Sequence, residues 1–148
     1  MFASDAEALA AAETAYANYE AAVDKSLQTI SAEGLGAVAT GDALKSAESS
    51  VDSFRTDGRT QRGDSKVGKV TAADLSALTV GGLAAGTSQI YACLDVSMVE
   101  VLDSAGHSVS APGRQTVFPT LVSLVWSMKN RKLLVSEESV WDGQDFCK

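Results

Sequence analysis

The two cysteines are the residues whose chemistry the sequence defines best. Cys93 lies in a predicted strand, and Cys147 lies just beyond the last predicted strand. Two cysteines and a single histidine are too few for a structural zinc site, and their spacing is not that of a CxxC redox pair. We predict a disulfide that closes a loop of about 55 residues and contributes roughly 4 kcal/mol to stability; two free buried thiols are the alternative. Because disulfides persist in oxidising compartments, the pair predicts an extracytoplasmic location.

The other chemistry-bearing side chains form no recognisable catalytic or cofactor motif. His107 is the only histidine and lies in a predicted turn between Gly106 and Gly113, where no neighbour in sequence could orient it as a base. The sequence contains no glycine-rich phosphate loop, metal-ligand cluster or nucleophile elbow. We therefore predict no cofactor and no metal. A basic cluster is interpreted as part of a solvated loop, with an anion site as the alternative: Arg55, Arg59, Arg62, Lys66 and Lys69.

Length and charge limit the classes of protein to consider. The chain has 148 residues, which favours one domain spanning residues 1–148. Its net charge of −7 argues against a nucleic-acid partner and against electrostatic docking to anionic lipid. The sequence has no apolar run of about 18 residues, so we expect no membrane insertion by this segment. Asp5 and Glu7 occupy the place of a signal peptide's apolar region, yet the two cysteines predict an oxidising compartment. A longer exported or lipid-anchored precursor would reconcile the two, and we expect one.

The first third of the chain shows a helical pattern. Ser4 and Glu7 have the spacing of a capping box, in which each side chain satisfies a free backbone amide. Apolar residues then recur at three- and four-residue steps: Leu9, Ala12, Tyr16, Tyr19, Val23, Leu27 and Ile30. An isolated coiled coil is the alternative. The many alanines in the stripe, and the strands that need a cover, favour a helix packed on a sheet.

A second helix and a further strand are expected before the long strands. The helix is predicted to begin with Thr40 or Asp42 as its cap and to end before Gly58, because glycine adopts the left-handed conformation readily. Residues 59–69 are then expected to form a polar loop. Residues 70–80 alternate imperfectly and predict a strand.

The last sixty or so residues predict three long strands, at 89–102, 114–128 and 133–141. Pro119 cannot donate to a ladder of backbone hydrogen bonds, so we expect it to mark a bulge or bend. The order of elements predicts an α+β fold. We expect N-terminal helices packed in a curved, mainly antiparallel four-stranded sheet.

Four segments carry a resemblance to a known group of proteins: Ala-Tyr-Ala-Asn-Tyr at 15–19, Ala-Thr-Gly-Asp-Ala-Leu at 39–44, Cys-Leu-Asp-Val-Ser at 93–97, and the ending at 140–147. With these, the chain resembles the nuclear-transport-factor-2-like superfamily, the cystatin-like cone folds. More narrowly, it is similar to small exported or lipoprotein-type domains of high-GC Gram-positive bacteria. The likeness extends over nearly the whole chain. Its motifs are degenerate, so it implies a fold, and folds of this kind host many functions.

The resemblance also implies a catalytic candidate. Cone-fold enzymes use an aspartate inside the cavity, often with a tyrosine or histidine. Asp95 with Tyr91 on the same strand parity matches that arrangement, and Asp74 is a more remote candidate. In an apolar cavity the carboxyl group would have a raised pKa and could act as a base. The interpretation we favour is that Asp95 hydrogen-bonds to the backbone or a neighbouring strand, or faces water.

Three functions are therefore considered. The first is a non-enzymatic exported domain that binds a protein partner or a small apolar ligand, at the open sheet face or the mouth of the cone. The second is a scaffold subunit of a conjugation- or secretion-type cell-envelope assembly, which predicts a homo-oligomer. The third is a small isomerase or dehydratase that uses Asp95 with Tyr91.

Overall fold

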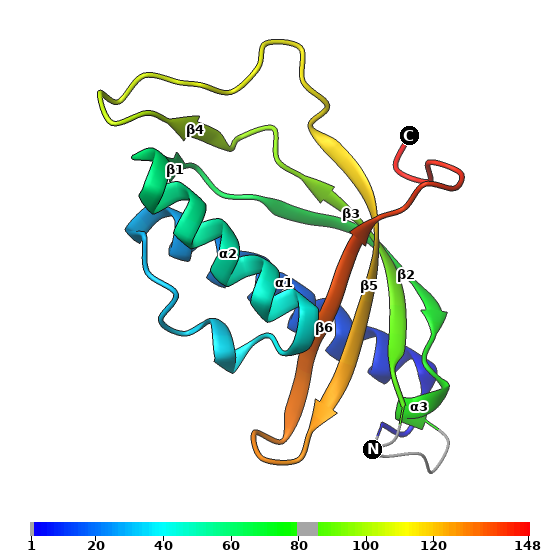
Figure 1. Ribbon diagram of the computed structural model, residues 1–148. Helices are drawn as coiled ribbons and strands as arrows, with labels where there is room; N and C mark the ends of the chain where they lie inside the picture. The colour runs from blue at the N-terminus through cyan, green and yellow to red at the C-terminus, as the bar shows by residue number, and fades with distance from the viewer. Residues whose placement is uncertain (1, 80–85) are drawn as a thin grey trace.

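The computed structural model describes residues 2–79 and 86–148 and shows two long helices against one face of a strongly curved sheet (Figure 1). The elements in chain order are α1 (Asp5–Thr29), η1 (Leu35–Ala37), α2 (Gly41–Asp57), β1 (Thr60–Arg62), β2 (Lys66–Asp74), α3 (Ser76–Thr79), β3 (Ser88–Asp95), β4 (Glu100–Leu102), β5 (Val117–Ser127) and β6 (Lys132–Val140). The predicted α+β class is confirmed.

Both long helices begin and end close to where the sequence predicts. The Ser4 hydroxyl accepts the Glu7 N–H at 3.2 Å, as a cap should. The Glu7 carboxylate accepts from Ala3 rather than from Ser4, so the capping box is displaced by one residue. Thr40 precedes α2 without a side-chain capping bond, and Gly58 ends that helix with a left-handed φ of 66°.

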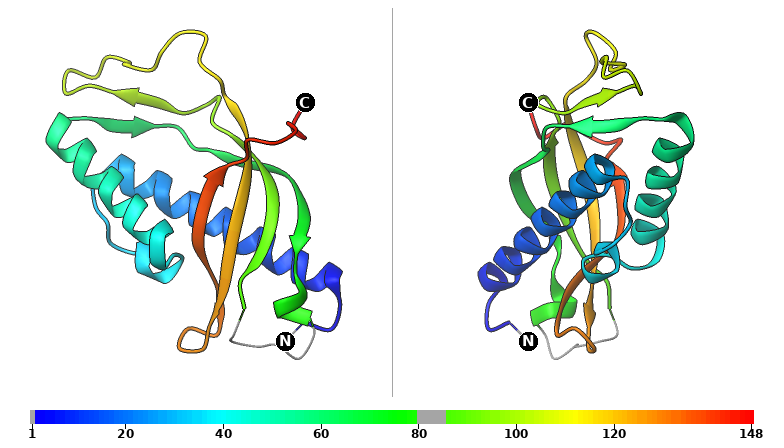
Figure 2. Two further views of the ribbon diagram at one scale, coloured as in Figure 1. Left: turned by 45° about the vertical axis from the view of Figure 1, so that its right-hand side comes forward. Right: turned by 90° about the vertical axis from the view of Figure 1, so that its left-hand side faces the viewer.

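The main sheet has the strand order β2-β3-β5-β6, and every neighbouring pair is antiparallel. This is the curved four-stranded sheet that the sequence predicts. A second, two-stranded sheet pairs β1 with β4 and extends beyond one end of the main sheet, as Figures 1 and 2 show. The first and last strands of the main sheet are both contacted by α1, which therefore crosses the sheet, whereas α2 packs on β6.

The core lies between α1 and the concave face of the sheet. Alternation along β3 buries Ile90 and Ala92 completely and places Tyr91 on the other face. The fully or almost fully buried members of the main cluster from α1, β3 and β5 are Ala8, Ala12, Tyr16, Tyr19, Ile90, Ala92, Val122 and Leu124. Alanine packs close to a sheet because it is small, and it favours helix strongly. Among the described residues no helix has the length and hydropathy that a membrane span requires.

Four local predictions are wrong. Residues 59–69 are not a loop, because β1 and the start of β2 lie there, and the strand predicted at 70–80 begins at Lys66 and ends at Asp74. The predicted Gly81-Gly82 end of that strand lies outside the described residues. The strand predicted at 89–102 is divided by a turn into β3 and β4. The ladder between β3 and β5 passes through Pro119 without a register shift. The shift lies in the β5–β6 ladder instead, between Ser123 and Leu124, where β6 has the extra residue Ser136.

Candidate functional site

The side chains of Asp95 and Tyr91 make unrelated contacts and form no common site. Asp95 is half-exposed at the end of β3, where its Oδ1 accepts the Ser97 N–H at 2.8 Å. The hydrogen bonds from Ser97 lower the pKa of Asp95, the opposite of what a buried catalytic base requires. Tyr91 packs edge-on against Trp141 and Phe146, with ring centroids 5.2 and 5.4 Å away. These contacts are those of a turn-stabilising carboxylate and a packed aromatic ring.

The other polar candidates are also accounted for locally. His107 is exposed, and its backbone N–H donates to Asp103 Oδ1 at 2.9 Å. Asp74 accepts from the Ser76 hydroxyl and N–H, and these bonds lower the pKa of Asp74. Arg62, from the predicted basic cluster, is paired with Glu100 across β1 and β4 at 3.0 Å. Within the described residues no group of three or more His, Cys, Asp or Glu side chains is placed to hold a metal ion.

The predicted disulfide is present. Cys93 and Cys147 are bonded, with Cα atoms 5.7 Å apart, and they are 54 positions apart in the chain. The bond holds the C-terminal segment against β3 on the face of the sheet that α1 does not cover. Trp141 and Phe146 contact Tyr91 on the same face. The C-terminal segment therefore packs its aromatic side chains on β3, and the disulfide holds it there.

An acid pair, the buried Glu20 and the half-buried Glu138, joins α1 to β6. The fully buried Tyr16 donates its hydroxyl to Glu138 Oε2 at 2.5 Å and lies 3.4 Å from the Thr120 hydroxyl. Glu20 follows Tyr16 by one helical turn, is 6% exposed, and has its carboxyl group beside that of Glu138. Burial, and then the hydrogen bond to and the charge of Glu138, raise the pKa of Glu20 well above its ordinary value.

A proton shared within this acid pair explains its geometry. Two ionised carboxylates can only accept hydrogen bonds, and Glu20 Oε1 then has no partner although it is buried. With a proton on Glu20, that carboxyl group becomes a donor and Glu138 beside it is an acceptor. Burial also raises the pKa values of Tyr16 and Tyr19, so both hydroxyls stay neutral donors beside the acids.

The two acids of the pair border different hollows. Glu138 borders a hollow of about 240 Å³ that apolar side chains line, whereas the Tyr16 side chain and Glu20 Oε1 are buried. The apolar lining residues are Leu94, Val96, Phe118 and Val140. A general acid or base must come within hydrogen-bond reach of the reacting atom. Glu138 borders this hollow, and Glu20 borders a second one of about 700 Å³ beside Asp24 and Lys25. The contact between the two acids itself links α1 to β6, so we interpret the pair first as a clamp between helix and sheet.

A third acid on the same side of α1 is fully partnered. Asp24 is 5% exposed, and its Oδ1 accepts from Gln61 Nε2 at 2.7 Å. Its Oδ2 accepts from both the N–H and the hydroxyl of Ser65 at 2.9 Å. Glu20 and Asp24 are not among the site residues predicted from the sequence. Their four-residue spacing after Tyr16 is a signal that could have placed them on the buried side of the helix.

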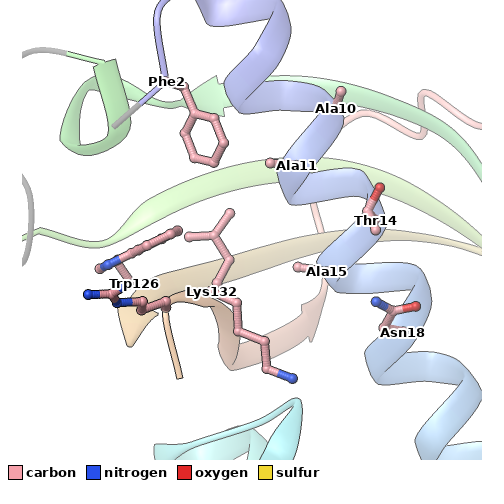
Figure 3. Close-up of a pocket in the computed structure, with 10 residues that line it drawn as sticks. Phe2, Ala10, Ala11, Thr14, Ala15, Asn18, Trp126 and Lys132 are labelled. Atoms are coloured by element: carbon pink, nitrogen blue, oxygen red, sulfur yellow. The ribbon is translucent and has the colours of Figure 1, made fainter. Parts of the chain in front are cut away.

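An apolar groove lies along a different face of α1, facing the β5–β6 hairpin (Figure 3). It has a volume of about 480 Å³. Phe2 and Trp126 form its aromatic part, with ring centroids 6.3 Å apart and planes at 83°. Phe2 is held by its N–H, which donates to the Leu78 carbonyl at 3.2 Å. The other lining residues are Ala10, Ala11, Thr14, Ala15, Asn18, Arg131, Lys132 and Leu133.

The rim of this α1–hairpin groove is basic on one side. Arg131 and Lys132 border it, and Lys129 lies in the same turn. In the described part of the chain, none of these three cations forms an ion pair. The α1 face in the groove carries no acid, although the helix contains five: Asp5, Glu7, Glu13, Glu20 and Asp24. The groove is thus a locally positive place on a protein of net charge −7.

Comparison with known proteins shows a fold and no family. No family model matches the chain, and no curated protein matches it. Among solved structures, the chain is similar to the intermembrane space region of the chloroplast protein ARC6, with a TM-score of 0.53 and 15% sequence identity. The match covers 89% of this chain and 95% of that one. Likeness at this identity shows the arrangement of helices and sheet alone.

Proposed function

We propose that this chain is a non-enzymatic binding domain that holds a small apolar ligand in the α1–hairpin groove. One observation carries the proposal: a half-buried pair of large aromatic side chains, Phe2 and Trp126, faces a wall of small side chains across open space. Aromatic rings gain most when their surface is removed from water. A ligand in the groove would remove from water the parts of Phe2 and Trp126 that the fold leaves exposed.

The size of the groove favours a small molecule over a protein partner. Its volume of about 480 Å³ falls within the range of roughly 300–1,000 Å³ that is usual for small-molecule sites. A stable protein interface buries about 1,200–2,000 Å² in total. The groove alone offers much less than that, so a protein partner would need further contacts that this surface does not define.

A catalytic role has less support. Asp95 and Tyr91 lie in a turn and an aromatic contact, and the acid pair has its proton in the protein interior. The enzyme and envelope-scaffold hypotheses therefore stay as alternatives without an observation that favours them. Membership of the nuclear-transport-factor-2-like superfamily likewise stays a prediction.

We further propose that the domain works outside the cytoplasm. The support is the Cys93–Cys147 disulfide, because cytosolic reductants keep most cysteines as thiols. The ARC6 region of similar fold is described as lying in an intermembrane space, which agrees with this proposal without carrying it. Mass spectrometry of protein taken from its natural compartment tests the point, and free thiols there would contradict it.

The binding proposal is tested by titrating the protein with decanol while recording amide chemical shifts by nuclear magnetic resonance. We expect saturable shifts confined to Phe2 and to residues 10–18 and 126–133. Filling the groove with Ala15→Phe should abolish them, because the ring takes the space of the ligand. Ala21→Phe is the matched control, since Ala21 is exposed on the same helix outside the groove. Shifts that centre on Leu94 and Val140, or no saturable shifts at all, would refute the assignment.

A further inference from the structure

Resting on the proposed function, we infer that the ligand of the α1–hairpin groove is a free amphiphile with one acyl-type chain and an anionic head. Lys132 marks the head end, and Phe2 with Trp126 marks the chain end. The apolar lining of the groove does not by itself determine the chemical class of the ligand, so the charges around the groove must do so.

The charge pattern gives the sign of the head group. Arg131 and Lys132 border an apolar surface and have no ion-pair partner among the described residues. In a protein with nineteen acidic and twelve basic side chains, unpaired cations beside an acid-free helix face are conspicuous. Exposed ion pairs are weak, but they orient a ligand whose apolar part is already held.

The layout of the groove gives the orientation of the ligand. Ala10 lies near Phe2, and Asn18 lies eight positions further along α1, a helix rise of about 12 Å. Figure 3 shows Lys132 and Asn18 toward the end of the groove away from Phe2. A carboxylate at that end could accept from the Lys132 ammonium and the Asn18 amide, while the chain extends over the alanine wall toward the aromatic pair.

The groove fits a free amphiphile better than a lipid in a membrane. A membrane lipid would need the surrounding surface to face anionic headgroups, and the chain as a whole carries a net charge of −7. Repulsion of the acidic surface from such a bilayer disfavours docking there. A single soluble molecule avoids that repulsion because only the basic rim lies close to its head.

The test compares three probes with the same chain and different heads: decanoate, decanol and decyltrimethylammonium, each below its micelle-forming concentration and at low salt. Isothermal titration calorimetry on the intact protein gives the dissociation constants. We expect decanoate to bind most tightly and the cationic probe least tightly. The advantage of decanoate over decanol should be about fivefold, the effect of one good exposed ion pair, and it should vanish at high salt.

Variants separate the charge from the apolar contact. Lys132→Gln should weaken decanoate about fivefold and leave decanol unchanged. Phe2→Ala should weaken both probes. Lys45→Gln removes an exposed lysine from α2, away from the groove, and should change neither.

The outcomes distinguish the two proposals. Equal affinity for all three probes overturns the anionic head and leaves the binding function standing, whereas no binding of any probe overturns both. Co-sedimentation with phosphatidylglycerol vesicles would overturn the free amphiphile in favour of a bilayer lipid. A dimer in sedimentation that Phe2→Ala dissociates would show that a second copy of the chain fills the groove.

Discussion

Replacing Glu20 by glutamine should remove a fall in stability that we expect of the wild-type protein as the pH rises above 4.5, the ordinary pKa of glutamate. Glutamine has nearly the same shape and keeps an N–H that can donate to Glu138. It cannot ionise. The variant therefore isolates the free energy of holding a proton on one buried carboxyl group, while the clamp between α1 and β6 keeps its hydrogen bond.

The sign and size follow from the raised pKa of Glu20. Below the ordinary value of 4.5, Glu20 is protonated in the folded and unfolded states alike. Above it, the unfolded chain releases the proton and the folded protein keeps it, so the free energy of unfolding falls as pH rises. The fall is about 1.4 kcal/mol for each pH unit until the pH passes the pKa of the folded state. At neutral pH the glutamine variant should accordingly be the more stable protein.

Other acids do not obscure this window. Four carboxyl groups have lowered pKa values because of hydrogen bonds from their neighbours: Asp74, Asp95, Glu100 and Asp103. A lowered pKa contributes stability that is present above the ordinary value and is lost only as pH falls further. Their effect is therefore confined to acid conditions, below the range in which Glu20 acts.

Urea unfolding between pH 5 and pH 8, followed by circular dichroism with the disulfide intact, measures the difference. Glu13→Gln is the control, because Glu13 is exposed on the same helix and should leave the pH profile of the wild type unchanged. Parallel profiles for the wild type and Glu20→Gln would refute the shared proton. They would mean that folding leaves the ionisation of Glu20 unchanged.

Two further predictions concern stability alone. Replacing Cys93 and Cys147 together by alanine should lower the free energy of unfolding by about 4 kcal/mol in urea titrations; a loss below about 1 kcal/mol would mean that the aromatic contacts hold the tail unaided. Gly63→Ala should lower the melting temperature far more than Gly106→Ala. Both glycines have φ of +84°, which costs alanine about 1–2 kcal/mol, but only at Gly63 would the new Cβ lie 2.0 Å from a carbonyl oxygen, that of Met98. Equal melting temperatures would contradict that close approach.

The elements that the sequence predicts well are those whose signals are local. The stripe of α1, its cap at Ser4 and the left-handed Gly58 each lie within a few residues of the boundary that they determine. The disulfide was predictable because only two cysteines exist to pair. In contrast, β2 is an edge strand with mostly exposed side chains, so its pattern is that of a loop. Its pairing with β3 supplies the strand, and that contact is not local.

The site was less predictable for the same reason. Glu20 and Glu138 meet only because α1 crosses the sheet, and nothing in either neighbourhood of the sequence indicates the other. The α1–hairpin groove combines Phe2, the middle of α1 and a hairpin near residue 130. Asp95 was predicted as a catalytic candidate because of a resemblance to cone-fold enzymes. In the structure its carboxylate accepts a hydrogen bond in the turn that divides β3 from β4. The alternation of side chains along a strand does not indicate such a turn.

The buried polar bonds of α1 provide what its alanines cannot. Ala8 and Ala12 are identical in shape and one helical turn apart, so packing at these two positions would change little if the helix slid along the sheet by one turn. The bond from Tyr16 to Glu138 has one geometry only. A slip that broke it would leave buried polar groups unpaired at a cost of about 1–3 kcal/mol each.

Keeping Glu20 protonated lowers the stability of the protein at neutral pH. The acid pair nevertheless makes one position of α1 on the sheet much lower in free energy than positions shifted from it. Buried polar groups can serve such a role even where apolar replacements would be more stable. That position of α1 also determines the groove. Ala11 and Ala15 form its helix wall only when Tyr16 points to β6. The same bonds that fix the helix on the sheet therefore fix the shape of the binding surface.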